Sequence, residues 1–150
     1  MGLTREVSLI QVPDAFIDQY DLHLGRGRNA IEGWIHVVRG QAASSVKVEI
    51  PELNATGTAK LDENGRAPIQ FAINGLRLWS PEDPRLYKVT LHPGDDTVDD
   101  LIGFRTIETS GTTILLNGKP IFLRGISIHS EAPYRTGRAY SEEDAETLLT

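Results

Sequence analysis

The sequence predicts an all-β fold in which two sheets pack as a sandwich, followed by a strand, a polar loop and a helix start. Residues 14–110 alternate apolar and polar side chains in short runs, which is the pattern of half-buried strands. Turn residues separate these runs at about the eight- to twelve-residue spacing typical of sandwiches. Helical spacing first appears after Ser141. Together these observations favour a sandwich over a helical or mixed fold.

The strands are predicted from inward-facing apolar sets. Val46, Val48 and Ile50 alternate with Lys47 and Glu49, which makes this run the cleanest half-buried strand. The other predicted inward sets are Phe16, Tyr20, Leu22 and Leu24; Ile31, Gly33, Ile35 and Val37; Ile69, Phe71 and Ile73; Tyr87, Val89 and Leu91; and Ile102 and Phe104 in a last strand ending near Glu108. Asp62–Gly65 is predicted as a hairpin turn, because Asn-Gly readily supplies the positive φ angles of such turns.

A different pattern begins after residue 110. Thr112–Leu116, Asn117-Gly118 and Lys119–Leu123 predict a hairpin, and Ile121–Ile128 reads as a strand that is apolar on both faces. Strands buried on both sides are typical of parallel sheets covered by helices. Ser141 is a good N-cap, followed by acidic residues that suit the helix dipole, although Asp144 replaces the usual Glu of a capping box. Strand, polar loop and helix form the first unit of a β/α protein.

Composition excludes several classes of function. The net charge of −6 and the lack of a Lys/Arg cluster argue against a nucleic-acid partner. No apolar run is long enough to span a bilayer, and no basic start with an apolar segment marks a signal peptide. The chain has no cysteine, so disulfides and thiolate metal sites are excluded. The compartment stays open, with a periplasmic or secreted parent protein as one alternative.

Three motifs resemble glycoside hydrolase family 2, which includes β-galactosidases, β-glucuronidases and β-mannosidases. The run Leu116–Pro120 (LNGKP), followed by Arg124–His129 (RGISIH), resembles the entry to that family's catalytic barrel. Leu78–Tyr87 (LWSPEDPRLY) and Gly103–Arg105 (GFR) resemble its immunoglobulin-like sandwich. The three motifs stand in the family's order and the resemblance covers nearly the whole chain.

The resemblance implies a domain organisation. Residues 14–110 would form the immunoglobulin-like β-sandwich. Residues 111–150 would form a hairpin, the first strand and the helix start of a truncated (β/α)8 barrel. Residues 1–13 would be a lead-in strand that resembles the end of a preceding sugar-binding jelly roll, and an ordinary first strand of the sandwich is the alternative.

The resemblance also implies substrate-binding residues. His129 follows the predicted barrel strand, where barrels place their active sites, and a matching His in the family touches the sugar. The alternative is a structural His at a strand end. Glu131 can bond a sugar hydroxyl or orient His129, and Arg124 fits an internal ion pair better than a sugar contact. Ser130 stands where the family often has an acid.

The catalytic pair of a retaining glycosidase is predicted to be missing. Such enzymes need two carboxylates across the glycosidic bond. Glu142 and Glu143 look like dipole-matching acids of a helix start, and the chain lacks the Asn-Glu dipeptide of the family's acid/base. The expected function is therefore a non-catalytic sandwich fragment of a β-glycosidase, with no metal or cofactor. Its partners would be a β-linked sugar and the remaining domains of the parent chain. A free-standing immunoglobulin-like module for carbohydrate binding or adhesion is the alternative.

Three further groups have a functional and a structural interpretation. Four acids could suggest Ca²⁺, but their spacing does not match an EF-hand and a solvated loop is favoured; they are Asp95, Asp96, Asp99 and Asp100. Trp34 and Trp79 could stack on sugars, and Trp79 is expected to pack at the sandwich edge instead. His23, His36 and His92 lie on separate predicted strands without ligand spacing.

Overall fold

A computed structural model describes residues 7–41, 44–94, 96–125, 127, 131–132 and 134–149. The chain divides into two compact units. One unit is Val12–Ile121, and the other combines Met1–Gln11 with Phe122–Thr150. The first unit contains the sandwich, and the second contains the short helix.

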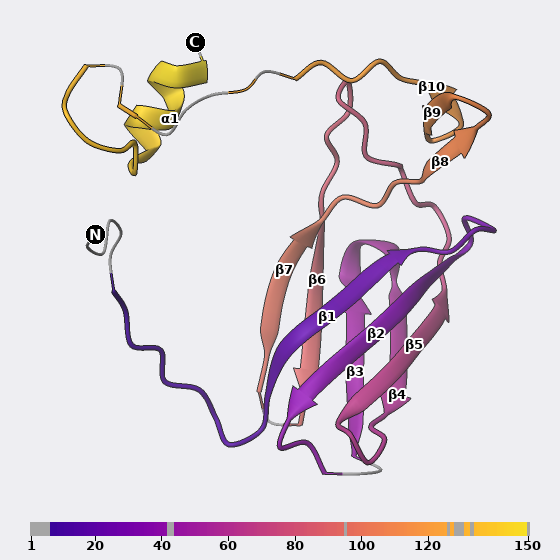
Figure 1. Ribbon diagram of the computed structural model, residues 1–150. Helices are drawn as coiled ribbons and strands as arrows, with labels where there is room; N and C mark the ends of the chain where they lie inside the picture. Colours follow the sequence, from indigo (N-terminus) through magenta and orange to yellow (C-terminus); the bar gives the residue numbers. More distant parts are fainter. Residues whose placement is uncertain are drawn as a thin grey trace. The chain divides into compact units, whose positions relative to one another are not determined.

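Two antiparallel sheets build the sandwich (Figure 1). The first sheet has the order β1-β2-β5 and contains β1 (Phe16–Leu24), β2 (Ala30–Val38) and β5 (Arg66–Ala72). The second has the order β4-β3-β6-β7 and contains β3 (Ser45–Ile50), β4 (Ala55–Lys60), β6 (Tyr87–Pro93) and β7 (Val98–Ile102). A 3₁₀ turn, η1 (Pro51–Leu53), separates β3 from β4. The all-β sandwich expected from the sequence is confirmed.

The core lies between the two sheets and follows the predicted alternation except at the start of β1. There a register shift between Ile17 and Gln19 packs Ile17 against the core in place of the predicted Phe16. Val46, Val48 and Ile50 on β3 are fully buried, as are Ile31 and Ile35 on β2. The inward sets of β5 and β6 are also buried and belong to the same hydrophobic cluster. Because burying each such side chain contributes about 1.5–3 kcal/mol, this cluster dominates the stability of the unit.

The Asp62–Gly65 turn is present, but the prediction of a hairpin there is wrong. The turn joins β4 to β5, which belong to different sheets. Only Gly65 of the Asn-Gly pair has a positive φ, 74°, and the Asp62 carboxylate accepts from the N–H groups of Asn64 and Arg66 at 2.8 and 2.9 Å. A Cβ on Gly65 would lie 2.4 Å from the Val37 carbonyl oxygen. Glycine is therefore required at this position both by the positive φ angle and by the lack of room for a side chain.

A small third sheet follows the sandwich strands. It has the order β10-β9-β8 and contains β8 (Ile107–Ser110), β9 (Thr113–Leu116) and β10 (Lys119–Pro120). Asn117 and Gly118 have φ angles of 54° and 82°, so the predicted Asn-Gly hairpin is confirmed. The single predicted strand from Ile102 to Glu108 is instead split, because β7 ends at Ile102 and β8 begins at Ile107.

The second unit contains α1 (Glu142–Leu149), which begins directly after Ser141 as predicted. The predicted barrel strand is not confirmed. Residues 121–125 form no strand, and Phe122 and Leu123 are 86% and 67% exposed. A parallel strand needs neighbours to complete its hydrogen-bond ladder, and none pairs with residues 122–125 in the described part of the chain. Among the described helices, none has the length and apolar character to cross a membrane.

Candidate functional site

The structure describes some of the predicted sugar-binding residues and not others. His129 and Ser130 lie outside the described residues. Arg124 is exposed, and the internal ion pair expected for it is not found among the residues that the structure describes. Glu131 is also exposed and forms an isolated antiparallel bridge with Arg138. Sugar binding by His129, Glu131 and Arg124 therefore stays a prediction.

A buried carboxylate lies close to this segment in sequence. Asp144 is 1% exposed and accepts hydrogen bonds from the Tyr134 hydroxyl, the Arg135 guanidinium at 2.5 Å, and the N–H groups of Tyr140 and Ser141 at 2.9 and 3.2 Å. In return, the Asp144 N–H donates to the Ser141 hydroxyl at 3.1 Å. The reciprocal pair is a capping box in which Asp serves in place of Glu.

The Asp144 contacts fix both its charge and the loop around it. The Tyr134 hydroxyl and the surrounding N–H donors hold the pKa of Asp144 well below its usual range, and the same contact raises the pKa of Tyr134. The loop is further closed by the Ala132 N–H, which donates to the Gly137 carbonyl at 3.0 Å. An anion whose oxygens are occupied by donors is unsuited to general acid or base work. Asp144 thus ties Tyr134, Arg135 and Tyr140 to the start of α1.

Sequence reasoning missed this network, although Ser141 and the acidic first turn were identified. The donors come from a loop, and their convergence on one carboxylate depends on the loop path. The available signal was the Ser-x-x-Asp spacing at Ser141 and Asp144. Glu142 and Glu143 are exposed in the first turn of α1, in agreement with their interpretation as dipole-matching acids.

The acidic residues near β7 form hydrogen bonds and ion pairs with other side chains of the protein. Asp99 accepts from Lys88 Nζ at 2.8 Å and from the Thr90 hydroxyl at 2.7 Å, and the Lys88 contact lowers the pKa of Asp99. Asp100 accepts from the Tyr20 hydroxyl. Both acids lie within β7 and not in a loop, which corrects that part of the prediction. No metal-binding group of three or more His, Cys, Asp or Glu residues occurs in the described part of the chain.

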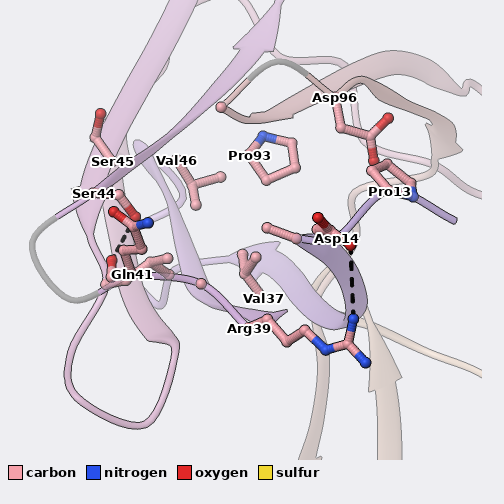
Figure 2. A pocket seen from close by; sticks show the side chains of 14 residues that line it. Pro13, Asp14, Val37, Arg39, Gln41, Ser44, Ser45, Val46, Pro93 and Asp96 are labelled. Carbon is pink, nitrogen blue, oxygen red and sulfur yellow. Dashed lines mark hydrogen bonds and ion pairs between the residues drawn. The ribbon is translucent and has the colours of Figure 1, made fainter.

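A hollow of about 580 Å³ opens at one end of the sandwich (Figure 2). Val37, Val46 and Pro93 contribute apolar groups to its lining. The Arg39 guanidinium lies 3.8 Å from the Asp14 carboxylate, and these side chains are 74% and 106% exposed. So exposed a pair contributes little energy and does not preorganise a catalytic group. The lining does not suggest a reaction.

The two tryptophans have separate roles. The backbone N–H of Trp79 donates to the Phe104 carbonyl at 2.9 Å, and the backbone carbonyl of Trp79 accepts from the Asn117 side-chain amide at 2.9 Å. Its indole packs so closely that a Cβ on Gly103 would lie 2.7 Å from the ring. These contacts support the expectation that Trp79 packs structurally. Trp34, by contrast, is partly exposed on β2 and is covered by the Arg66 guanidinium, 4.2 Å from its ring centroid.

Comparison with known proteins identifies the sandwich. The profile of the family described as Glycosyl hydrolases family 2 matches residues 31–105, which is half of the chain and extends from β2 past β7. The chain belongs to this family. The resemblance noted in the sequence motifs is thereby confirmed.

The relatives are long enzymes, of which this chain matches a part. It is 30% identical over 157 residues to a β-galactosidase of Streptococcus thermophilus and 32% identical over 160 residues to one of Halalkalibacterium halodurans. Each alignment covers 95% of this chain and 15% of the relative. A β-glucuronidase of Lactobacillus rhamnosus superposes with a TM-score of 0.66 and 28% identity, covering 90% of this chain and 23% of that protein. The chain therefore spans about 15% of the length of the β-galactosidases that it matches.

Proposed function

We propose that the chain is a non-catalytic segment of a retaining β-glycosidase that hydrolyses terminal β-galactosides or related β-glycosides. The family match over β2 to β7, with 30% and 32% identity to two β-galactosidases, supports this proposal most directly. The acids whose contacts are described support it further. Asp99, Asp100 and Asp144 are held in hydrogen bonds or ion pairs, as expected of structural carboxylates.

In the parent enzyme, we propose that residues 111–150 form a hairpin, the first strand and the helix start of a (β/α)8 barrel. The confirmed Asn117-Gly118 hairpin and the capped start of α1 support this part. Strand Ile121–Ile128 would deliver His129 and Glu131 to the sugar, while Arg124 would lie within the barrel. The nucleophile and the acid/base would come from other parts of the enzyme and would act through a glycosyl-enzyme intermediate.

Nitrophenyl glycosides test both parts of the proposal. The full-length enzyme should release nitrophenol from the β-galactoside faster than from the β-glucuronide and the β-mannoside. The 150-residue chain should release it from none. Turnover that co-purifies with the short chain and resists host-enzyme controls would overturn the assignment of a non-catalytic segment. An inactive but folded full-length enzyme on all three substrates would overturn the assigned substrate class.

A further inference from the structure

Three of the five asparagines in the sequence are followed directly by glycine. These dipeptides are Asn64-Gly65, Asn74-Gly75 and Asn117-Gly118. Asparagine is chemically labile in such pairs, because the backbone nitrogen of a residue without a side chain approaches the asparagine side-chain carbonyl carbon most easily. The same chemistry is thus available at three places, and the structure around each place decides how readily it occurs.

The Asn117 side chain is held at both ends of its amide. Its Nδ2 donates to the Trp79 carbonyl at 2.9 Å, and its Oδ1 accepts from the Thr106 N–H at 3.0 Å. The Asn117 N–H also donates to the Thr106 carbonyl at 2.9 Å. Before its carbonyl carbon could meet the Gly118 nitrogen, the side chain would have to leave both partners and leave two backbone groups unpaired. Asn117 is therefore protected by its hydrogen bonds.

At Asn64 the protection lies on the other reacting group. The Asn64 side chain is exposed, but Gly65 is buried and its N–H donates to the Asp62 carbonyl at 3.1 Å. The Asn64 N–H donates in turn to the Asp62 carboxylate at 2.8 Å. These bonds fix the backbone on both sides of the Asn64 side chain, so the Gly65 nitrogen cannot turn freely toward it. Asn64 is therefore protected in part.

Neither kind of protection is present at Asn74 and Gly75. Both residues are exposed, and in the described part of the chain neither the Asn74 side chain nor the Gly75 N–H makes a hydrogen bond. Gly75 has a φ of 73°, and apart from its chain neighbours no heavy atom lies within 4 Å of the position that a Cβ would take. The pair follows the end of β5 in open space, so both reacting groups are free to move.

We propose that Asn74 is the site at which this chain preferentially undergoes spontaneous deamidation. The Gly75 nitrogen attacks the side-chain carbonyl carbon of Asn74, the new C–N bond closes a succinimide ring, and the bond to the side-chain nitrogen breaks. The Gly75 N–H gives its proton to solvent, and the side-chain nitrogen takes a proton from solvent and leaves as ammonia. Water then opens the ring at either carbonyl, which leaves aspartate or isoaspartate at position 74. This chemistry does not depend on the glycosidase role proposed above.

Anchored residues flank the reactive pair. The Ile73 N–H donates to the Asn29 carbonyl at 2.9 Å, and the Arg77 N–H donates to the Tyr87 hydroxyl at 2.9 Å. Ile73 also belongs to the buried core. Either product adds one negative charge, and isoaspartate also lengthens the backbone by one carbon atom between these anchors. We expect the sandwich to stay folded, because the change falls in an exposed loop and not in a strand.

The test incubates the intact 150-residue chain in neutral buffer below its melting transition, with a second sample in urea. Trypsin places the three asparagines on separate peptides, residues 61–66, 67–77 and 106–124, so mass spectrometry follows the rate at each one. A methyltransferase specific for isoaspartate identifies that product. In the folded chain we expect Asn74 to react about tenfold faster or more than Asn117, because the hydrogen bonds of Asn117 add to its barrier. Asn64 should react at a rate between these two, and in urea the three rates should converge.

Matched variants separate the proposed site from its surroundings. Asn74→Gln should remove the reaction from residues 67–77, because glutamine would have to close a larger ring. Asp62→Ala removes the acceptor for the Asn64 N–H, so it should speed the reaction at Asn64 toward its rate in urea and leave the rate at Asn74 unchanged. Unchanged circular dichroism shows that each sample stays folded.

Three outcomes would overturn the proposal. They are equal rates at the three sites in the folded chain, a rate at Asn74 below that at Asn64 or Asn117, and a rate at Asn74 that rises in urea as steeply as the rate at Asn117. None of these readouts requires glycosidase turnover, so failure here is distinguishable from failure of the proposed function.

Discussion

The hydroxyl of Tyr20 on β1 donates a hydrogen bond to the carboxylate of Asp100 on β7. Each strand lies at the edge of its own sheet, so this bond links the two sheets along one side of the sandwich. Partial burial, together with the bond to the Asp100 anion, raises the pKa of Tyr20 to about 12. Because of this link, the stability of the sandwich should fall as the pH rises into the alkaline range.

Tyr20→Phe should reveal that dependence. In the unfolded chain tyrosine ionises near pH 10, whereas in the folded chain Tyr20 stays protonated to about pH 12. The Tyr20 contribution is thus fully present below pH 10 and is lost as the pH rises toward 12. Urea unfolding at pH 8, 10 and 11 should show a shallower alkaline loss for Tyr20→Phe than for the wild type. Tyr140→Phe, in the other unit, is the control, and identical slopes for Tyr20→Phe and the wild type would contradict the assignment.

Asn117→Gly should destabilise the sandwich without disturbing the turn. Glycine accepts the φ of 54° at this position, so only the side-chain bonds are removed. Those bonds join the Asn117 amide to the Thr106 N–H at 3.0 Å and to the Trp79 carbonyl at 2.9 Å. Leaving the two backbone groups unpaired should cost about 1–3 kcal/mol. Denaturant unfolding measures the loss, and Asn64→Gly in an exposed turn should change stability by less than about 0.5 kcal/mol.

The stability of a shortened chain depends on the same Asn117 contacts. Residues 14–110 contain every strand of the two large sheets and should unfold cooperatively. They lack Asn117, however, so we expect this chain to be less stable than one covering 12–121. Guanidinium unfolding followed by fluorescence and circular dichroism should give coincident transitions for both. A molten, dye-binding product from residues 14–110 would show that the sandwich strands are not sufficient.

The strands could be predicted because burial with a period of two is a local property of sequence. Val46, Val48 and Ile50 illustrate this, since their alternation directly gives their buried face. The Asp62–Gly65 turn was located, but its chemistry does not determine whether the next strand pairs with the last or crosses to the other sheet. The donors around Asp144 depend on the path of a loop, which no periodicity encodes. His129 was identified from a family motif and not from any local physical pattern.

Asp144→Asn should loosen the start of α1. The change removes the anion and places an amide N–H₂ among groups that already donate, including Arg135 and the Tyr140 N–H. In Asp144→Asn we expect faster hydrogen exchange of the backbone amides of Tyr140 and Ser141. The control variant Glu142→Gln should leave the exchange rates of these amides unchanged. Because the pKa of Asp144 is lowered, its contribution should be complete above the unfolded value and lost only as the pH falls through the lower folded value. Unchanged exchange in Asp144→Asn would show that the loop is held by other contacts.

His129→Ala in the full-length enzyme tests the proposed sugar contact. Neutral imidazole can donate one hydrogen bond and accept another, so it can hold a sugar hydroxyl while a neighbouring group fixes its tautomer. A contact that tightens as the sugar ring flattens toward an oxocarbenium ion lowers both kcat and kcat/KM when it is lost. By analogy with other transition-state donors, the loss should be about 2–4 kcal/mol of barrier, or roughly a hundredfold or more in kcat.

The matched control is His92→Ala, because His92 pairs with Glu49 on the outside of the second sheet at 2.9 Å. It should leave kcat unchanged and alter stability only slightly, as exposed pairs do. Melting temperature separates the two interpretations of His129. A hundredfold slower enzyme with an unchanged Tm places the contact on the sugar in the transition state. An enzyme that melts several degrees lower with kcat intact would show that His129 supports the end of a strand and does not contact the substrate.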